Sequence, residues 1–175
     1  MRFNETSLPG VFVIEPEFMR DERGFFARTF CTKEFDAQGL NSIFDQCSVS
    51  YNIKKGTVRG MHYQTAPDEE VKLVRCTKGA IFDVAVDPSS GNWFGVELSA
   101  ANRKALYIPK GFAHGFQTLS DETEVFYQIA GVYRADSARG LRWNDPSLGI
   151  TWPFEVSVIS KRDQEYQLLT CEKKS

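Results

Sequence analysis

Short apolar runs, separated by Gly, Pro, Asn and Asp, constrain the fold of this chain more than any other feature. In the run 80–86, Phe82 and Val84 fall on one face of an extended chain, while Asp83 and Ala85 fall on the other. This period of two is typical of β-strands. The clearest runs are Val11–Glu15, Gly24–Phe30, Val71–Cys76, Ala80–Val86, Trp93–Ser99, Ala105–Pro109, Gly115–Leu119 and Val125–Ile129. Short strands spaced regularly over about a hundred residues predict a mainly β protein, either a sandwich or a barrel.

Turns are well marked in the sequence, whereas helical signals are few. Pro88–Asn92 and Pro109–Gly111 are turn sequences that join consecutive runs. In Thr32–Asp36 the threonine is positioned to cap a short helix, and Ser160–Leu169 can form one or two helical turns. No internal repeat, low-complexity segment or linker divides the 175 residues, so we expect a single domain over residues 1–175. The charged tail Glu172–Ser175 is expected to fray.

The charge and the cysteines restrict the class of protein. A formal net charge of −2 argues against a nucleic-acid-binding protein, because such proteins carry a basic excess. No run approaches the roughly 18 apolar residues of a membrane span. The start, MRFNETSLPG, lacks the apolar stretch of a signal peptide. We therefore expect a cytoplasmic protein whose cysteines, scattered and without a C-x-x-C pair, are reduced: Cys31, Cys47, Cys76 and Cys171.

The segment VRGMHYQ, at 58–64, and the following KLVRC, at 72–76, contain the first candidates for chemistry. His62 is one of only two histidines in the chain, and a histidine titrates near pH roughly 6.5. Lys72 can place a positive charge beside a carbonyl group. If the fold brings the two together, they suggest proton abstraction next to a carbonyl. The alternative is a buried histidine bonded to a backbone carbonyl. A strand face that mixes polar and apolar residues suits a pocket wall better, and this face contains Val58, Gly60, His62 and Gln64.

His114 lies in IPKGFAHGF, which looks like the second metal-binding motif of the cupins, a jelly-roll superfamily. The first cupin motif requires His-x-His and a later Glu, but here the sequence is His62-Tyr63-Gln64. A site with three nitrogen ligands therefore cannot be built, although Gln or Glu ligands remain a minor alternative. We expect no metal, with His114 in the pocket or directly behind it.

Three arginines lie in or beside apolar runs, and guanidinium groups bind phosphate oxygens well: Arg23, Arg59 and Arg75. A strict strand pleat would put Arg59 on the face opposite His62. A shared pocket therefore requires a bulge or a contribution across a dimer interface. Tyr127, in VFYQI, can present its hydroxyl as a proton donor.

Several long motifs resemble the dTDP-4-dehydrorhamnose 3,5-epimerase family of nucleotide-sugar biosynthesis. They are GVFVIEPEFMRDERGFF, VRGMHYQ, KLVRCTKGAIFDVAVD, WFGVELSAANRKALYIPKGFAHGF and RGLRWNDPSLGITWP, and they extend from about Gly10 to Asp163. The resemblance implies a cupin-like jelly roll that works as a homodimer without metal or another cofactor. Its substrate would be a nucleotide-diphosphate-linked 4-keto sugar, in deoxysugar or lipopolysaccharide-type polysaccharide biosynthesis.

The same resemblance implies roles for single residues. His62 matches the catalytic base and Asp163 the carboxylate that orients it. Lys72 matches the lysine beside the substrate carbonyl, and Tyr127 the proposed acid on the opposite sugar face. The base would remove a hydrogen next to the keto group, and the acid would return one to the resulting enolate. The candidate substrate-binding residues are Arg23, Arg59, Phe26, Gln46, His114 and Arg28.

The chain departs from the family pattern at two places near its nucleotide site. The family usually has a glutamate where this chain has Arg28. It often reads Gln-Asp-Asn-His-Ser where this chain has Gln46–Ser50, with a one-residue insertion before VRG. The sequence therefore leaves the nucleotide open among dTDP, CDP and others, and it also leaves open whether carbon 3, carbon 5 or both are inverted.

Three other functions compete with epimerisation. A 3,4-ketoisomerase could use the same histidine on the same class of substrate. A non-catalytic sugar-nucleotide-binding jelly roll would be expected to lack the base or its partner, and both His62 and Asp163 are present. The missing His-x-His argues against a metal-dependent cupin oxygenase.

Overall fold

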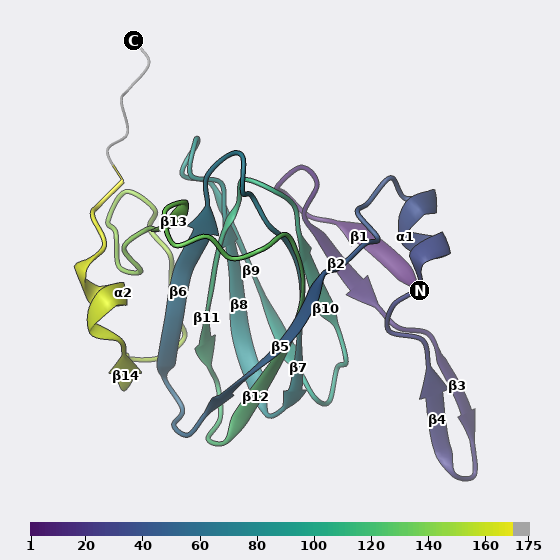
Figure 1. The fold of residues 1–175 in the computed structure, drawn as a ribbon. Coiled ribbons are helices and arrows are strands. Elements are labelled where there is room, and N and C mark those ends of the chain that lie inside the picture. Colours follow the sequence, from purple (N-terminus) through teal and green to yellow (C-terminus); the bar gives the residue numbers. More distant parts are fainter. Residues whose placement is uncertain (170–175) are drawn as a thin grey trace.

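The computed structural model describes residues 1–169 and shows an antiparallel β-sandwich with two short helices (Figure 1). The first sheet contains, in spatial order, β1 (Arg2–Glu5), β2 (Phe12–Glu15), β10 (Ala105–Ile108), β7 (Val71–Lys78), β12 (Thr123–Ala130) and β5 (Gln46–Asn52). The second contains β13 (Ala138–Gly140), β6 (Thr57–Gln64), β11 (Ala113–Thr118), β8 (Ala80–Val86) and β9 (Trp93–Ser99), with β14 (Val158–Ile159) parallel to β6. The hairpin of β3 (Phe18–Asp21) and β4 (Gly24–Ala27) is separate, and the helices are α1 (Thr32–Ala37) and α2 (Lys161–Glu165).

The mainly β, jelly-roll-like architecture confirms the fold predicted from the sequence. Each of the eight apolar runs contains or overlaps a strand, and the two turn sequences connect β8 to β9 and β10 to β11. The predicted cap of α1 is wrong, because Cys31 occupies the N-cap and Thr32 is already helical. At α2 the Ser160 hydroxyl accepts a hydrogen bond from the Asp163 N–H and caps the helix. None of the helices within residues 1–169 has the length and apolar character needed to cross a membrane.

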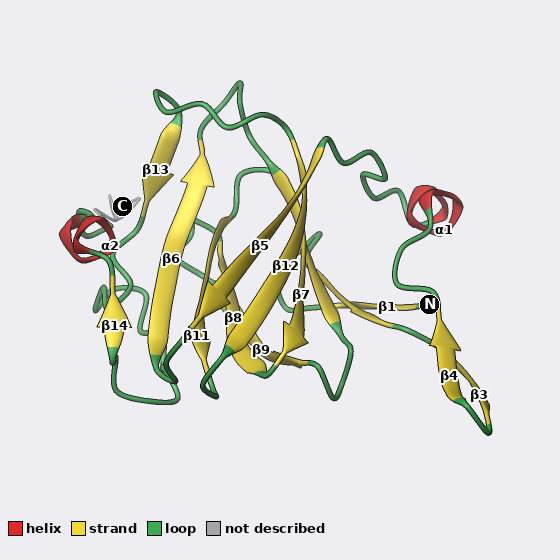
Figure 2. Cartoon of the chain, turned by 60° about the horizontal axis from the view of Figure 1, so that its bottom comes forward, coloured by secondary structure: helices red, strands yellow, loops and turns green. Residues whose placement is uncertain are grey.

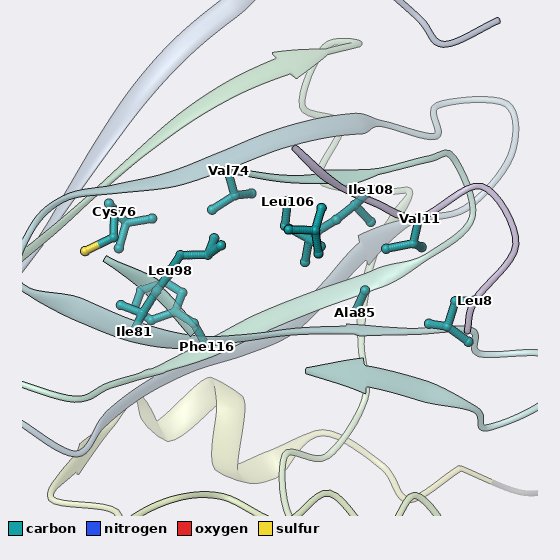
Figure 3. Close-up of a cluster of buried hydrophobic side chains, with 12 residues drawn as sticks. Leu8, Val11, Val74, Cys76, Ile81, Ala85, Leu98, Leu106, Ile108 and Phe116 are labelled. Atoms are coloured by element: carbon teal, nitrogen blue, oxygen red, sulfur yellow. The ribbon is translucent and has the colours of Figure 1, made fainter. Parts of the chain in front are cut away.

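Alternation along the strands decides which side chains enter the space between the sheets. On β7, Val74 and Cys76 belong to the core between the sheets, whereas Leu73 packs with Phe35 of α1 on the outer side. The inner core combines residues of both sheets, including Leu106, Ile81 and Phe116 (Figure 3). Burial of each large apolar side chain stabilises the fold by about 1.5–3 kcal/mol.

The inward faces are not apolar along their whole length. Lys72 has the same strand parity as Val74, and Tyr127 the same parity as Val125, so both polar side chains point between the sheets. These polar positions line a cavity whose wall also includes residues of β5 and β6. Figure 2 shows these two strands, which belong to different sheets. The same alternation therefore builds both the apolar core and the polar wall beside it.

Candidate active site

The cavity has a volume of about 370 Å³ and is lined by six strands together with the segments after β12 and around α2. Its wall contains five of the residues singled out from the sequence: His62, Lys72, Tyr127, Arg59 and His114. The other lining residues are Ser48, Val49, Ser50, Tyr63, Gln64, Glu70, Phe116, Ile129, Tyr133, Ala138, Arg139, Arg162 and Tyr166. Thus one strand pair, β6 and β11, contributes both histidines.

A bulge between β6 and β11 brings Arg59 and His62 to the same cavity. His62 pairs with His114 and Arg59 with Phe116, so three steps on β6 match two steps on β11. A β-bulge of this kind shifts the alternation of side chains by one residue. At the bulge the strands approach closely, because a Cβ on Gly115 would lie 2.8 Å from the Arg59 carbonyl oxygen.

The bulge also corrects the predicted strand face. Val58 and Gly60 are buried and do not line the cavity with His62, whereas Gln64 does. The sequence offered two ways for Arg59 and His62 to share a pocket, a bulge or a dimer interface, and the bulge is confirmed.

His62 and Asp163 form a close pair although they are 101 residues apart in the sequence. His62 Nε2 lies 2.7 Å from Asp163 Oδ1, and the Gly60 N–H donates to Asp163 Oδ2 at 3.3 Å. Burial acts to raise the pKa of Asp163, but the bond to His62 and the donors from Gly60 and Ser160 outweigh burial and hold that pKa below its usual value. An ionised carboxylate only accepts, so Nε2 carries the hydrogen and His62 Nδ1 is free to take a proton.

Lys72 is held at the cavity wall by two acceptors. Its Nζ lies 3.1 Å from Glu70 Oε2, and it donates to the His62 carbonyl oxygen at 3.4 Å. Sequence reasoning missed Glu70, although its position two residues before Lys72 could have indicated that both side chains share one face.

Tyr127 presents its hydroxyl inside the cavity from β12. The hydroxyl lies 3.3 Å from Ser50 Oγ on the neighbouring strand β5. Burial raises the pKa of Tyr127 well above its ordinary value, so the hydroxyl stays protonated as a hydrogen donor. Its ring meets the ring of His114 edge-on, with centroids 6.1 Å apart.

His114 forms a second pair with a buried carboxylate. Its Nε2 lies 2.7 Å from Asp83 Oδ1, and neither side chain is appreciably exposed. Both histidines thus direct Nε2 to a carboxylate, and the two Nε2 atoms do not point to a common metal position. Within residues 1–169, no three or more His, Cys, Asp or Glu side chains are grouped so that they could hold a metal ion.

Four of the predicted substrate-binding residues lie outside the cavity wall of the chain. Arg23, Phe26 and Arg28 belong to the β3–β4 hairpin and its exit, which projects from the sandwich (Figure 1). There Arg23 pairs with Asp21. The fourth, Gln46, donates to the Gly131 carbonyl oxygen at 3.0 Å. Their binding roles stay predictions.

The segment around α2 adds cavity residues that sequence reasoning missed. Arg162 precedes Asp163 directly, and Tyr166 places its ring edge-on to His62 with centroids 6.0 Å apart. A Cβ on Gly140 would lie 2.3 Å from the Tyr166 ring, so the absence of a side chain there makes room for this packing. One short helix therefore brings three side chains to the surroundings of His62.

Comparisons with known proteins show the family to which the chain is similar. A model of the family described as dTDP-4-dehydrorhamnose 3,5-epimerase matches residues 5–170. The chain is 44% identical over 169 residues to the dTDP-4-dehydrorhamnose 3,5-epimerase of Shigella flexneri, covering 93% of each chain. It is 36% identical to a dTDP-4-dehydrorhamnose 3-epimerase of Streptomyces niveus, covering 97% of this chain and 84% of that protein. The crystal structure of the Bacillus anthracis 3,5-epimerase with TDP and PPi bound superposes with a TM-score of 0.91 at 39% identity, covering 96% of this chain and 99% of that one.

Proposed function

The chain belongs to the dTDP-4-dehydrorhamnose 3,5-epimerase family and is an isomerase, and we propose that it inverts carbon 3, carbon 5 or both of a nucleotide-linked 4-keto-6-deoxy sugar. One observation carries the proposal: the His62–Asp163 pair opens to a cavity that also contains Lys72 and Tyr127. A base, a cation and a hydroxyl donor in one cavity are what proton transfer beside a carbonyl requires.

The proposed reaction begins at the keto group on carbon 4, which acidifies the hydrogens on carbons 3 and 5. His62 Nδ1 removes one of these protons, and Asp163 stabilises the imidazolium that forms. The Lys72 ammonium stabilises the negative charge that develops on the carbonyl oxygen. The pair thus acts as base and orienting carboxylate, and the lysine as the charge-stabilising group.

Inversion requires a proton from the other face of the sugar, and we assign this step to Tyr127. Its hydroxyl stays protonated because burial raises its pKa, whereas an enolate is basic enough to take the proton. The contact with Ser50 Oγ restricts the direction of the hydroxyl. Epimerisation at each carbon then consists of removal on one face and return on the other.

The diphosphate is proposed to bind at the basic part of the cavity wall. Arg59, Arg139 and Arg162 all line the cavity, and guanidinium groups match phosphate oxygens in pairs of hydrogen bonds. The carrier can be dTDP, CDP or another nucleotide. A thermal-shift series with dTDP, CDP, GDP and UDP should identify it, because a ligand at a hundred times its dissociation constant stabilises the fold by about 2.7 kcal/mol.

We further propose that the protein is a cytoplasmic homodimer in which the β3–β4 hairpin of one chain reaches the cavity of the other. Arg23, Phe26 and Arg28 all lie on or beside this hairpin, outside the cavity of their own chain. The edge strand β5, which flanks the cavity, also exposes Val49 and Tyr51. Mixing Arg23→Ala with His62→Asn should then restore activity that each variant lacks alone. Light scattering that shows a monomer would contradict the dimer.

The decisive experiment follows hydrogen exchange in heavy water. Purified protein is incubated with dTDP-4-keto-6-deoxyglucose, and deuterium at carbons 3 and 5 and the configuration of each carbon are read by NMR. Epimerisation predicts deuterium together with inversion. A carbonyl that moves from carbon 4 to carbon 3 would indicate a 3,4-ketoisomerase, and binding without exchange would indicate a non-catalytic sugar-nucleotide-binding protein.

The proposed mechanism needs no metal or organic cofactor, because base, acid and charge stabilisation come from side chains. We therefore expect the exchange rate to survive treatment with a chelator. Loss of exchange on chelation, restored by one particular metal ion, would contradict this part of the proposal.

A further inference from the structure

Glu70 contributes the only carboxylate to the cavity wall among residues 1–169, and no step of the proposed reaction uses it. It directly precedes β7 and lies two residues before Lys72, so strand alternation directs both side chains inward. The two side chains are each only 10% exposed, and Glu70 Oε2 lies 3.1 Å from Lys72 Nζ. This is a largely buried ion pair inside the site.

Lys72 has two acceptors at the cavity wall. An ammonium group carries three N–H donors. The Lys72 Nζ forms an ion pair with Glu70 Oε2 at 3.1 Å and donates a hydrogen bond to the His62 carbonyl oxygen at 3.4 Å. Both acceptors belong to the wall, and three donors exceed two acceptors, so at least one N–H is left for the cavity.

We propose that Glu70 is a positioning residue that fixes the Lys72 ammonium so that its remaining N–H meets the carbonyl oxygen of the substrate; this inference rests on the proposed function. A lysine stem is flexible, and a donor stabilises a developing oxyanion only when it is already in place. Misplacement of a catalytic group by about 1 Å can cost about 10²-fold in rate.

The negative charge of Glu70 opposes the benefit of its positioning role. A carboxylate beside an ammonium offsets part of the positive potential that stabilises an enolate. If charge were the main effect of Glu70, removing that charge would accelerate enolate formation. If position is the main effect, removing the contact slows it, so the sign of the change separates the two roles.

The test measures deuterium exchange into the 4-keto sugar in four variants. In Glu70→Ala, exchange should fall by about 10²-fold, because nothing then directs the ammonium. In Glu70→Gln, which keeps an oxygen acceptor, the loss should be about tenfold or less. Glu70→Asp keeps the charge but draws the carboxylate back from Lys72, so exchange should fall there as well. Glu69→Ala is the matched control, since Glu69 lines a different surface hollow and should leave exchange unchanged.

A double-mutant cycle with Lys72→Met tests whether Glu70 acts through Lys72. Glu70→Ala should cost little further exchange in that background, since the residue that it positions is gone. Binding of dTDP, measured by calorimetry, should stay near the wild-type value in Glu70→Asp and Glu70→Gln. This result would separate a defect in positioning from a defect in folding.

Three outcomes would overturn the inference: wild-type exchange in both Glu70→Ala and Glu70→Asp, faster exchange in Glu70→Gln, or additive losses in the double variant. Failure of the proposed function gives a different result, since wild-type protein would then show no exchange at all or would move the carbonyl from carbon 4 to carbon 3.

Discussion

Two histidine–carboxylate pairs lie next to each other in this protein and differ in access rather than in distance. His62 and His114 are paired directly across β6 and β11, and each Nε2 lies 2.7 Å from an aspartate oxygen. The His62 side chain is 46% exposed, whereas that of His114 is 6% exposed. His62–Asp163 is therefore the open pair and His114–Asp83 the closed pair. Distance alone does not identify the base, because only the imidazole of the open pair is exposed enough to meet a substrate.

The two carboxylates also differ in their hydrogen bonds. Asp163 accepts from His62 with one oxygen and from the Gly60 N–H with the other. Asp83 is fully buried, and its Oδ2 has no hydrogen-bond partner among the described residues. A buried carboxylate depends strongly on the partners it has. The closed pair is thus expected to matter for the fold, and the open pair for the chemistry.

The largest expected effect is on the open pair. His62→Asn should lower deuterium exchange into the substrate by about 10²- to 10⁴-fold, the usual loss for a general base. His114→Asn should retain much more exchange, because that imidazole is committed to a buried carboxylate. Rates of exchange measured by NMR under identical conditions decide the comparison. Near-native exchange in His62→Asn would remove the assignment of the base, and equal losses in both variants would remove the distinction between the pairs.

Tyr127, which contacts His114 on the closed side, gives a second test. Enolate formation needs only the open pair and Lys72, so Tyr127→Phe should still exchange deuterium. Inversion needs a donor on the opposite face, so epimerised product should fall much further than exchange does. Wild-type protein analysed in parallel supplies the reference ratio of product to exchange. An equal decline in both would make Tyr127 a positioning residue and leave another group as the acid.

A third, smaller effect concerns stability. Asp83→Ala leaves the buried His114 Nε2 without its partner and should lower the free energy of unfolding by about 1–3 kcal/mol. Asp163→Ala should cost less, since the half-exposed His62 can turn to solvent. Urea unfolding of both variants measures the difference. If Asp163→Ala proved the more destabilising, the open pair would be the one that supports the fold.

The smallest effect is a dependence of stability on pH. The pKa of Asp163 in the folded protein lies below its ordinary value of 3.8, so its ionised form favours folding. That contribution is complete above 3.8 and is lost as the pH falls through the lowered value. The difference in Tm between wild type and Asp163→Asn should therefore shrink at pH values below 3.8. A difference that stays constant over this range would mean that Asp163 is not stabilised by its partners in the folded state.

Local pattern was enough to predict much of this protein. The period of two located the strands, and on β7 it puts Lys72 on the same face as Val74. This works because side-chain direction along a strand depends only on backbone geometry. The motifs led from there to the epimerase family and to His62, Lys72 and Tyr127, which the structure brings into one cavity.

Only the tertiary structure decided which of these side chains meet. The sequence contains no local signal that α2 returns to β6, where Asp163 meets His62 across 101 residues. The bulge that turns Arg59 toward His62 depends on how β6 pairs with β11, and a shift of one residue reverses every side chain that follows. The ion pair of Glu70 with Lys72 was recognised only in the folded structure, where both side chains are largely buried. Strand alternation is a local property and could therefore be predicted from the sequence. Strand register and the docking of α2 depend on contacts between distant segments, so they exist only in the folded chain.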